Sequence, residues 1–259
     1  MAEPTAGPVV GPAFYARRGG RAADWWTLLH PPYTLWHLSY VGLGAAVAPA
    51  LDWFALACSV AAFFLAVGLA AHALDELNGR PLGTGIGDRT LWTVAVAALV
   101  GAAAIGGYGI WFHTSETNWL LAACVPVGAL LVVGYNLELF GGRLHTDAGF
   151  AWAWGGFPVA VGYLAQSPLQ APGPTVASLA AAVAAVLAAV GTAAAQRVLS
   201  TNARGLRRRT AEVSGTIRHL DGRVEPIDRQ TLLAAPERAL RAMSWALPLL
   251  AAAVLLARA

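Results

Sequence analysis

The stretch HALDELNGRPLGTGIGDR, residues 72–89, gathers the side chains of this chain that are best suited to chemistry. Directly after a long apolar run, it brings together an imidazole, two carboxylates, an amide and a guanidinium, at His72, Asp75, Glu76, Asn78 and Arg80. Ionisable groups at the end of an apolar span are costly and usually mark a functional site. This stretch is therefore the first candidate for one.

The spacing of His72, Asp75 and Glu76 is i, i+3, i+4, which places the three side chains on one face of a helix. Carboxylates so placed could hold Mg²⁺ through one or two oxygens, with waters and substrate phosphates completing the octahedron. We predict Asp75 and Glu76 as metal ligands and catalytic residues, with His72 orienting them and Mg²⁺ as the cofactor. The alternative is a hydrogen-bonded His–Asp pair that only caps a helix.

Two further groups of polar residues lie at the ends of later apolar runs, one around residues 135–147 and one around 196–204. The arginines among them could neutralise phosphate oxygens; otherwise they serve only to fix the topology. His145 with Asp147 would also suit a softer metal such as Zn²⁺. The predicted substrate-binding residues are Asn78, Arg80, Tyr135, Asn136, Arg143, His145, Arg197, Asn202 and Arg204.

The composition predicts a membrane protein. Hydrophobic residues make up 57% of the chain and charged residues only 12%, against about 25% charged in a soluble domain. Several apolar runs approach the roughly 20 residues needed to cross a hydrocarbon core. We expect an all-α, polytopic membrane helical bundle whose partner is a lipid and not a nucleic acid. Cys58 and Cys124 lie inside apolar runs and are expected to be unpaired.

The predicted membrane domain covers residues 22–259 and contains seven spans. They are Leu35–Ala50, Trp53–Leu74, Leu91–Trp111, Trp119–Tyr135, Phe150–Ala165, Thr175–Leu199 and Ala239–Leu256. His37 lies inside the first span, where a hydrogen bond between helices is a commoner role than ligand binding.

Outside the spans, residues 1–21 are rich in Pro, Gly and Ala and predict a disordered tail. A short helix with Trp25 and Trp26 would follow, and Pro31 and Pro32 would then break the chain before the first span. The one long loop, at about 200–236, contains TIRHLDGRVEPI. Its Asp-Gly pair predicts a short hairpin with a type I′ turn.

The arginines predict the orientation. The chain has no lysine, and 16 of its 17 arginines fall in the tail and the even-numbered loops; only Arg258 lies on the other side. The positive-inside rule then places the N-terminus and the candidate site in the cytoplasm and the C-terminus outside. We expect the plasma membrane of a prokaryote.

The order of these features resembles the UbiA superfamily of intramembrane prenyltransferases. PPYTLWHLSYVGLGAAVAP resembles the first span of that family. AAHALDELNGRPLGTGI resembles its first Asp-rich motif, and YNLELFGGRLHTDAGFAWAWGGFPVAVGYLAQ resembles its central Tyr-bearing loop and the Gly-rich span after it. The resemblance covers about the first two-thirds of the chain. It implies a helical membrane fold and Mg²⁺-assisted transfer of a prenyl group from an isoprenoid diphosphate.

The chain also departs from the family pattern. Of the three aspartates in the first motif only Asp75 remains, with Glu76 beside it; Ala71, His72 and Gly79 occupy the other motif positions. The second Asp-rich motif should follow the sixth span, where AAAQRVLSTNARGLRRR has no carboxylate. The family usually has nine spans rather than seven.

The resemblance implies a membrane prenyltransferase that acts on an isoprenoid diphosphate in a cytoplasm-facing pocket. The lost aspartates favour a second possibility, a non-catalytic lipid-binding or accessory membrane protein that keeps the fold. A small transporter is a third, although the sequence shows no inverted repeat. The acceptor, the prenyl chain length and the oligomeric state are left open by the sequence.

Overall fold

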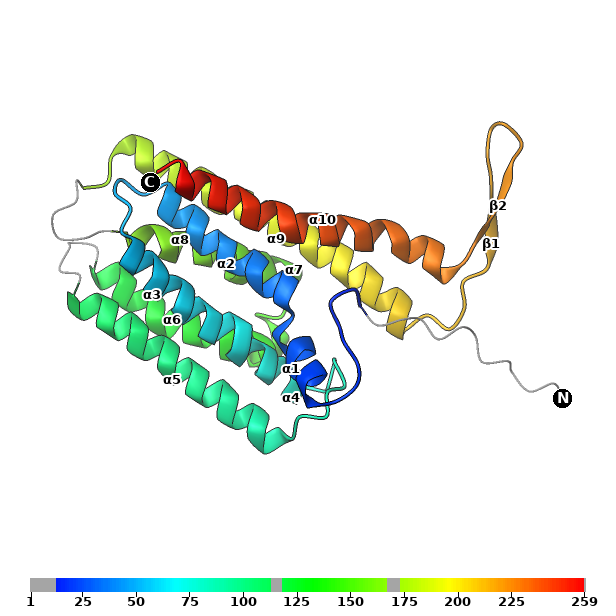
Figure 1. Cartoon of the computed structure of the whole chain (residues 1–259), viewed down its shortest axis with the longest axis horizontal. Helices are drawn as coiled ribbons and strands as arrows, with labels where there is room; N and C mark the ends of the chain where they lie inside the picture. The colour runs from blue at the N-terminus through cyan, green and yellow to red at the C-terminus, as the bar shows by residue number, and fades with distance from the viewer. Residues whose placement is uncertain (1–12, 113–117, 167–172, 259) are drawn as a thin grey trace.

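The computed structural model describes residues 13–112, 118–166 and 173–258 of the chain. It is a bundle of helices lying roughly side by side, with a small hairpin projecting from one end (Figure 1). Five helical stretches in the described residues are long and apolar enough to cross a membrane: Trp53–Leu77, Asp88–Trp111, Trp119–Asn136, Val176–Arg208 and Arg229–Leu256. The fold is therefore the all-α bundle expected of a membrane protein.

The five stretches correspond to five of the seven predicted spans. The first of them is one continuous helix made of α3 (Trp53–Phe63), the π-helical η1 (Phe64–Ala71) and α4 (His72–Leu77). The others are α5 (Asp88–Phe112), α6 (Asn118–Asn136), α9 (Val176–Arg208) and α10 (Arg229–Leu256).

The two other predicted spans are helical but are not among the five stretches that are long and apolar enough to cross a membrane. One is α2 (Pro31–Ala46), which has 16 residues. The other is a broken run of α7 (Asp147–Phe150), the π-helical η3 (Ala151–Gly156) and α8 (Phe157–Leu164). Both pack inside the bundle, α2 between α8 and α10, and η3 against α9. Five spans are thus supported by length and apolarity, and seven remains a prediction.

The chain breaks before the first predicted span, as expected: one helix ends at Leu29, His30 follows, and the Pro31–Pro32 pair begins α2, with proline in its first turn. A proline there loses nothing, because its missing N–H would have had no partner within the helix. The expected short helix is present as α1 (Arg21–Leu29). His30 joins the two helices in a left-handed conformation, with φ of 44°.

Glycine lets α2 and α8 pack backbone to backbone. A Cβ atom added to Gly44 would lie 2.0 Å from Val159 O, and one added to Gly162 would lie 2.2 Å from Val41 O. Close approach of this kind through small residues is typical of helices packed in membranes. We call this contact the α2–α8 seam.

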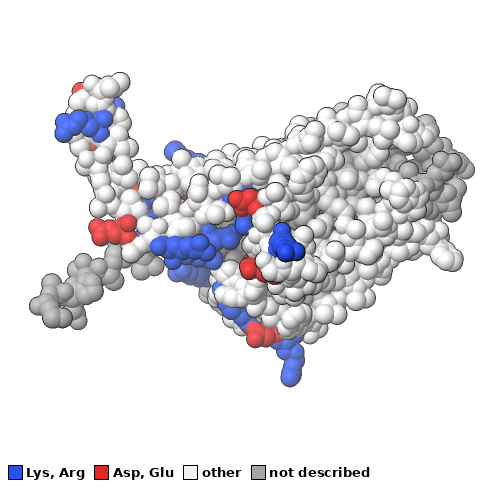
Figure 2. Space-filling view, turned by 180° about the vertical axis from the view of Figure 1, so that it is seen from behind, with Lys and Arg blue, Asp and Glu red and all other residues white. Residues whose placement is uncertain are grey.

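The helix α9 has 33 residues, or about 50 Å at 1.5 Å per residue, which exceeds a hydrocarbon core of about 30 Å. Its C-terminal half and the N-terminal half of α10 extend together beyond the other helices (Figure 1). Seen from behind, this end carries most of the visible charged side chains, while the opposite end is nearly free of them (Figure 2). We call it the arginine-rich end.

The predicted hairpin is present: β1 (Gly215–Arg218) pairs antiparallel with β2 (Val224–Ile227), and Thr216 faces Pro226. Its predicted turn type is wrong. A type I′ turn needs positive φ at both central residues. Between the two strands only Gly222 has a positive φ. The Gly222 N–H donates to His219 O, so Gly222 is the last residue of the turn. It leads the chain into β2.

Candidate functional site

A polar pocket of about 680 Å³ opens among the helices at the arginine-rich end. Its walls come from the segment before α1, the α1–α2 corner, α4 with the loop after it, the end of α6, and one face of α9. The α9 residues that line it recur at helical spacing: Gln196, Arg197, Ser200, Ala203, Arg204, Arg207 and Arg208. Segments far apart in sequence thus meet around one cavity.

The structure brings most of the predicted site residues to this pocket. His72, Asp75, Arg80, Tyr135, Asn136, His145, Arg197 and Arg204 all line it. Glu76, Asn78, Arg143 and Asn202 are not among the lining residues. Arg143 and Asn202 are exposed, and Asn78 donates from Nδ2 to Asn136 O, joining the ends of α4 and α6.

Glu76 is fully buried, and both of its carboxylate oxygens are engaged. Oε2 accepts from Leu82 N at 2.8 Å, and Oε1 accepts from Thr84 N at 2.7 Å and from Thr84 Oγ1 at 2.9 Å. This carboxylate holds the loop after α4. In the described structure its role is structural, unlike the predicted role of a metal ligand.

Asp75 directly precedes Glu76, but its carboxylate faces the pocket and has no protein partner: no hydrogen bond or ion pair from a described residue engages it. His72 lies one turn earlier; its Nδ1 bonds to Gly68 O at 3.1 Å, and its ring lies 4.5 Å from the ring of His30. The predicted His–Asp pair is therefore not hydrogen-bonded, and the carboxylate is available to a ligand.

The arginines around the pocket divide into paired and unpaired groups. Arg80 pairs with Asp88, Arg197 donates to Asp147 at 2.9 Å, and Arg207 pairs with Glu237. Arg204 and Arg208, one turn apart on α9, have no such partner among the described residues. These two guanidinium groups are free to bind an anion, and their planar geometry suits bidentate pairing with phosphate or carboxylate.

Two buried polar groups in the pocket wall also lack partners. Tyr135 stacks on His145, with ring centroids 4.4 Å apart, and packs edge-on against Trp154. Its hydroxyl oxygen and Gln196 Oε1 are buried without a hydrogen-bond partner among the described residues. Buried polar atoms are rarely left unpaired, so both can bond to a polar group that enters the pocket.

The segment before α1 also contributes to the pocket. Tyr15 lies over His30 and Tyr33, with ring centroids 4.5 Å and 5.2 Å away. The Arg17 N–H donates to Thr27 Oγ1, and this hydroxyl donates back to Arg17 O, both at 2.9 Å. Residues 1–12 of the predicted disordered tail lie outside the described residues. The prediction of disorder is wrong for residues 13–18, which line the cavity.

Two titratable groups of this covering layer are shifted. Burial raises the pKa of Tyr15, although Arg204 and Arg208 oppose that shift. Burial and the neighbouring His72 hold the pKa of His30 well below its usual value of 6.5. Both groups are therefore uncharged at neutral pH and add no positive charge to the pocket.

Some of these residues were missed from the sequence. Tyr15 and His30 stand in stretches whose prolines and glycines suggested a tail and a chain break. Arg208 belongs to an arginine run whose helical spacing could have indicated it. His37 was predicted to bond between helices, and its Nδ1 does bond to Trp154 O at 3.0 Å.

Magnesium in a two-carboxylate site does not fit these residues. The oxygens of Glu76 are occupied by three donors, which leaves Asp75 as the available carboxylate of the expected pair. Within the described part of the chain, no group of three or more His, Cys, Asp or Glu side chains could hold a metal ion. The chemistry considered below therefore relies on the side chains themselves.

Comparison of the chain with protein-family models, with curated proteins and with solved structures gives no match.

Proposed function

We propose that this protein is a membrane-embedded, UbiA-like prenyltransferase that takes an isoprenoid diphosphate, or a related lipid phosphate, into the polar pocket. The observation that carries the proposal is the unpaired Arg204 and Arg208 in the same cavity as the unpaired carboxylate of Asp75. The proposal places the arginine-rich end in the cytoplasm of a prokaryote and the C-terminus outside, because 16 of the 17 arginines then lie inside.

In the proposed reaction, Arg204 and Arg208 bind the diphosphate. The bond between the allylic carbon and the diphosphate oxygen breaks, and the diphosphate leaves with the electron pair. The two guanidinium groups stabilise the charge that develops on the leaving diphosphate. The acceptor forms the new bond to the allylic carbon, and Asp75 takes the proton that the acceptor loses. Tyr15 and Tyr33 cover the pocket and exclude water.

A non-catalytic lipid-binding protein is the second candidate. Two observations favour it: Glu76 is committed to its loop, and the face of α9 that lines the pocket carries no carboxylate. This protein would use the same arginines to hold a lipid phosphate without breaking it.

The test is equilibrium binding of tritiated farnesyl diphosphate to the protein in nanodiscs, with EDTA present. Hydrogen bonds to charged groups contribute about 1.5–3 kcal/mol, so Arg204→Gln and Arg208→Gln should each weaken binding about tenfold or more. Arg143→Gln is the matched control, since Arg143 is exposed at the same end but does not line the pocket.

Unchanged binding in both α9 variants would contradict the proposal. Release of diphosphate on adding an acceptor or Mg²⁺ would select the transferase, and tight binding without release under either condition would select the second candidate.

A further inference from the structure

Residues 13–18, which we call the strap, form one wall of the polar pocket without belonging to a helix of the bundle. All six of these residues line the pocket. The strap is part of the dark blue loop that leads into α1 in Figure 1. Among the described residues, one hydrogen bond joins its backbone to itself, from Ala16 N to Ala13 O at 2.9 Å. A segment with so few backbone hydrogen bonds can open locally while the helices stay folded.

The strap is fastened to the short helix α1 by two side chains. The Thr27 hydroxyl bonds to both backbone groups of Arg17. Trp26 Nε1 donates to Tyr15 O at 3.0 Å, and the Trp26 ring lies 3.9 Å from the guanidinium carbon of Arg17. Each of these contacts is weak by itself, because water replaces a hydrogen bond that opens. The position of the strap therefore depends on a few contacts that can break without disturbing the bundle.

On its inner side the strap packs against rings. Phe14 meets Tyr33 edge-on with ring centroids 5.9 Å apart, and the guanidinium carbon of Arg241 lies 5.4 Å from the centre of the Phe14 ring. Tyr15 lies over His30 and Tyr33. Within the described residues, no hydrogen bond or ion pair joins the strap to α9, another wall of the pocket. The strap can therefore separate from α9 without leaving a hydrogen-bonding group of that helix unsatisfied.

Two consecutive glycines, Gly19 and Gly20, connect the strap to α1. Their φ angles are 100° and 89°, and a Cβ atom added to either would meet nothing within 4 Å. Glycine adopts such positive φ angles at little cost, and it can also leave them freely. The chain can therefore rotate about this pair without a collision, which makes it a suitable hinge.

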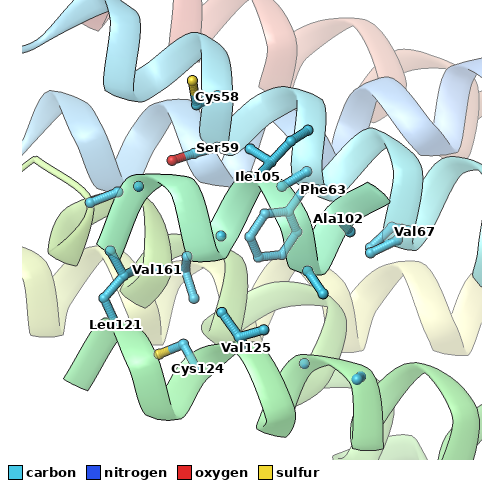
Figure 3. Close-up of a pocket in the computed structure, with 18 of the residues that line it drawn as sticks. Cys58, Ser59, Phe63, Val67, Ala102, Ile105, Leu121, Cys124, Val125 and Val161 are labelled. Atoms are coloured by element: carbon cyan, nitrogen blue, oxygen red, sulfur yellow. The ribbon is translucent and has the colours of Figure 1, made fainter. Parts of the chain in front are cut away.

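A second cavity, which we call the apolar cavity, adjoins the polar pocket but does not suit the entry of an anion. It lies between α3, α5, α6 and α8, and Figure 3 shows carbon side chains such as Phe63 and Leu121 around it. It meets the polar pocket at Val67 and Trp154, which line both. An anion on this route would lose its water to surroundings that are mostly carbon, at a high cost in free energy.

We propose that the strap is a lid, which closes the polar pocket in this structure and rotates about Gly19 and Gly20 to let a polar ligand in and out. Because a ligand passes the lid on entry and on exit, loosening the lid raises both rates by a similar factor and changes the affinity little. The inference goes beyond the proposed function. It concerns access to the pocket, and it holds for a transferase and for a lipid-binding protein alike.

The test measures how often the pocket opens, without any substrate. Ser200→Cys places a thiol on the face of α9 that lines the pocket. The probe is the anionic reagent (2-sulfonatoethyl) methanethiosulfonate, applied to the protein in nanodiscs. Mass spectrometry separates labelling at this position from labelling at Cys58 and Cys124, the two cysteines of the native chain.

Two further substitutions, each made in the Ser200→Cys protein, loosen the lid in different ways. Thr27→Val removes both hydroxyl bonds to the strap and keeps the side-chain shape, so labelling should be about tenfold faster or more. Its matched control is Thr93→Val, which removes a hydroxyl bond to Arg89 O within α5, away from the pocket, and should leave the rate unchanged.

The second substitution acts on the hinge. Gly20→Ala strains the closed conformation without removing a contact, so labelling should be about fivefold faster or more. Gly222→Ala is its control, because Gly222 has a similar φ of 84° but lies in the hairpin, away from the pocket.

Unchanged labelling in both Thr27→Val and Gly20→Ala would overturn the lid. So would labelling of the protein with Ser200→Cys alone at the rate of a free thiol, since the pocket would then be open. A third contradiction would be farnesyl diphosphate binding that weakens tenfold in Thr27→Val with labelling unchanged, because the strap would then be a fixed part of the binding wall.

Discussion

The α2–α8 seam and the apolar cavity, a space of about 540 Å³ between α3, α5, α6 and α8, both contain glycine, yet the surroundings of these glycines differ. At the seam, a single added carbon at Gly44 or Gly162 would overlap a backbone oxygen of the facing helix. In the cavity wall, a Cβ added at Gly109 would meet nothing within 4 Å. Gly44 and Gly162 are thus held against the backbone of the facing helix, whereas Gly109 borders open space.

The largest expected effect comes from adding one methyl group to a glycine of the seam and, in a separate variant, one to a glycine of the cavity wall. Gly162→Ala should destabilise the protein by about 3 kcal/mol, because Val41 O is backbone and cannot move aside cheaply. Gly109→Ala should be neutral or stabilise by about 1 kcal/mol, since alanine is the better helix former. Unfolding in a denaturing detergent series measures both, and equal losses would show that the two regions do not differ in packing.

Glu76 and Asp75 differ in a similar way: the Glu76 carboxylate is surrounded by hydrogen-bond donors, and the Asp75 carboxylate faces the open pocket. Glu76→Gln should lose about 2 kcal/mol of stability, because an amide NH₂ would then point at backbone donors that need an acceptor. Asp75→Asn should change stability by less than about 0.5 kcal/mol, because its carboxylate has no protein partner to lose.

Thermal unfolding of Glu76→Gln and Asp75→Asn, measured side by side with the wild-type protein, tests these two stability predictions. A stable Glu76→Gln variant that has lost ligand binding would restore the predicted role of Glu76 at a metal.

Much of the fold was predictable from apolar run length. The long helices α3–α4, α5, α6, α9 and α10 each contain a predicted span, because a bilayer-length apolar run leaves few alternatives to a helix. The hairpin was predictable from its β-prone residues around Asp-Gly. The turn type was not, because Asp221 adopts a negative φ that the sequence leaves open.

The candidate site was predictable in place but not in detail. The convergence of α4, α6 and α9 on one pocket follows from polar residues at matching ends of their spans. The separate roles of Asp75 and Glu76 do not follow, because they depend on where the loop at Leu82 and Thr84 folds back. The apolar cavity left no signal, because alanine and glycine at these spacings are equally compatible with tight packing.

The central claim is that the polar pocket binds the diphosphate of an isoprenoid lipid. The most direct test is photo-cross-linking with a farnesyl diphosphate analogue that carries a diazirine on the carbons next to the diphosphate. The account predicts adducts on the α9 residues between 196 and 208 that line the polar pocket, removed by an excess of farnesyl diphosphate. Adducts confined to outward-facing residues such as Val183 and Leu249, both well exposed, would contradict it.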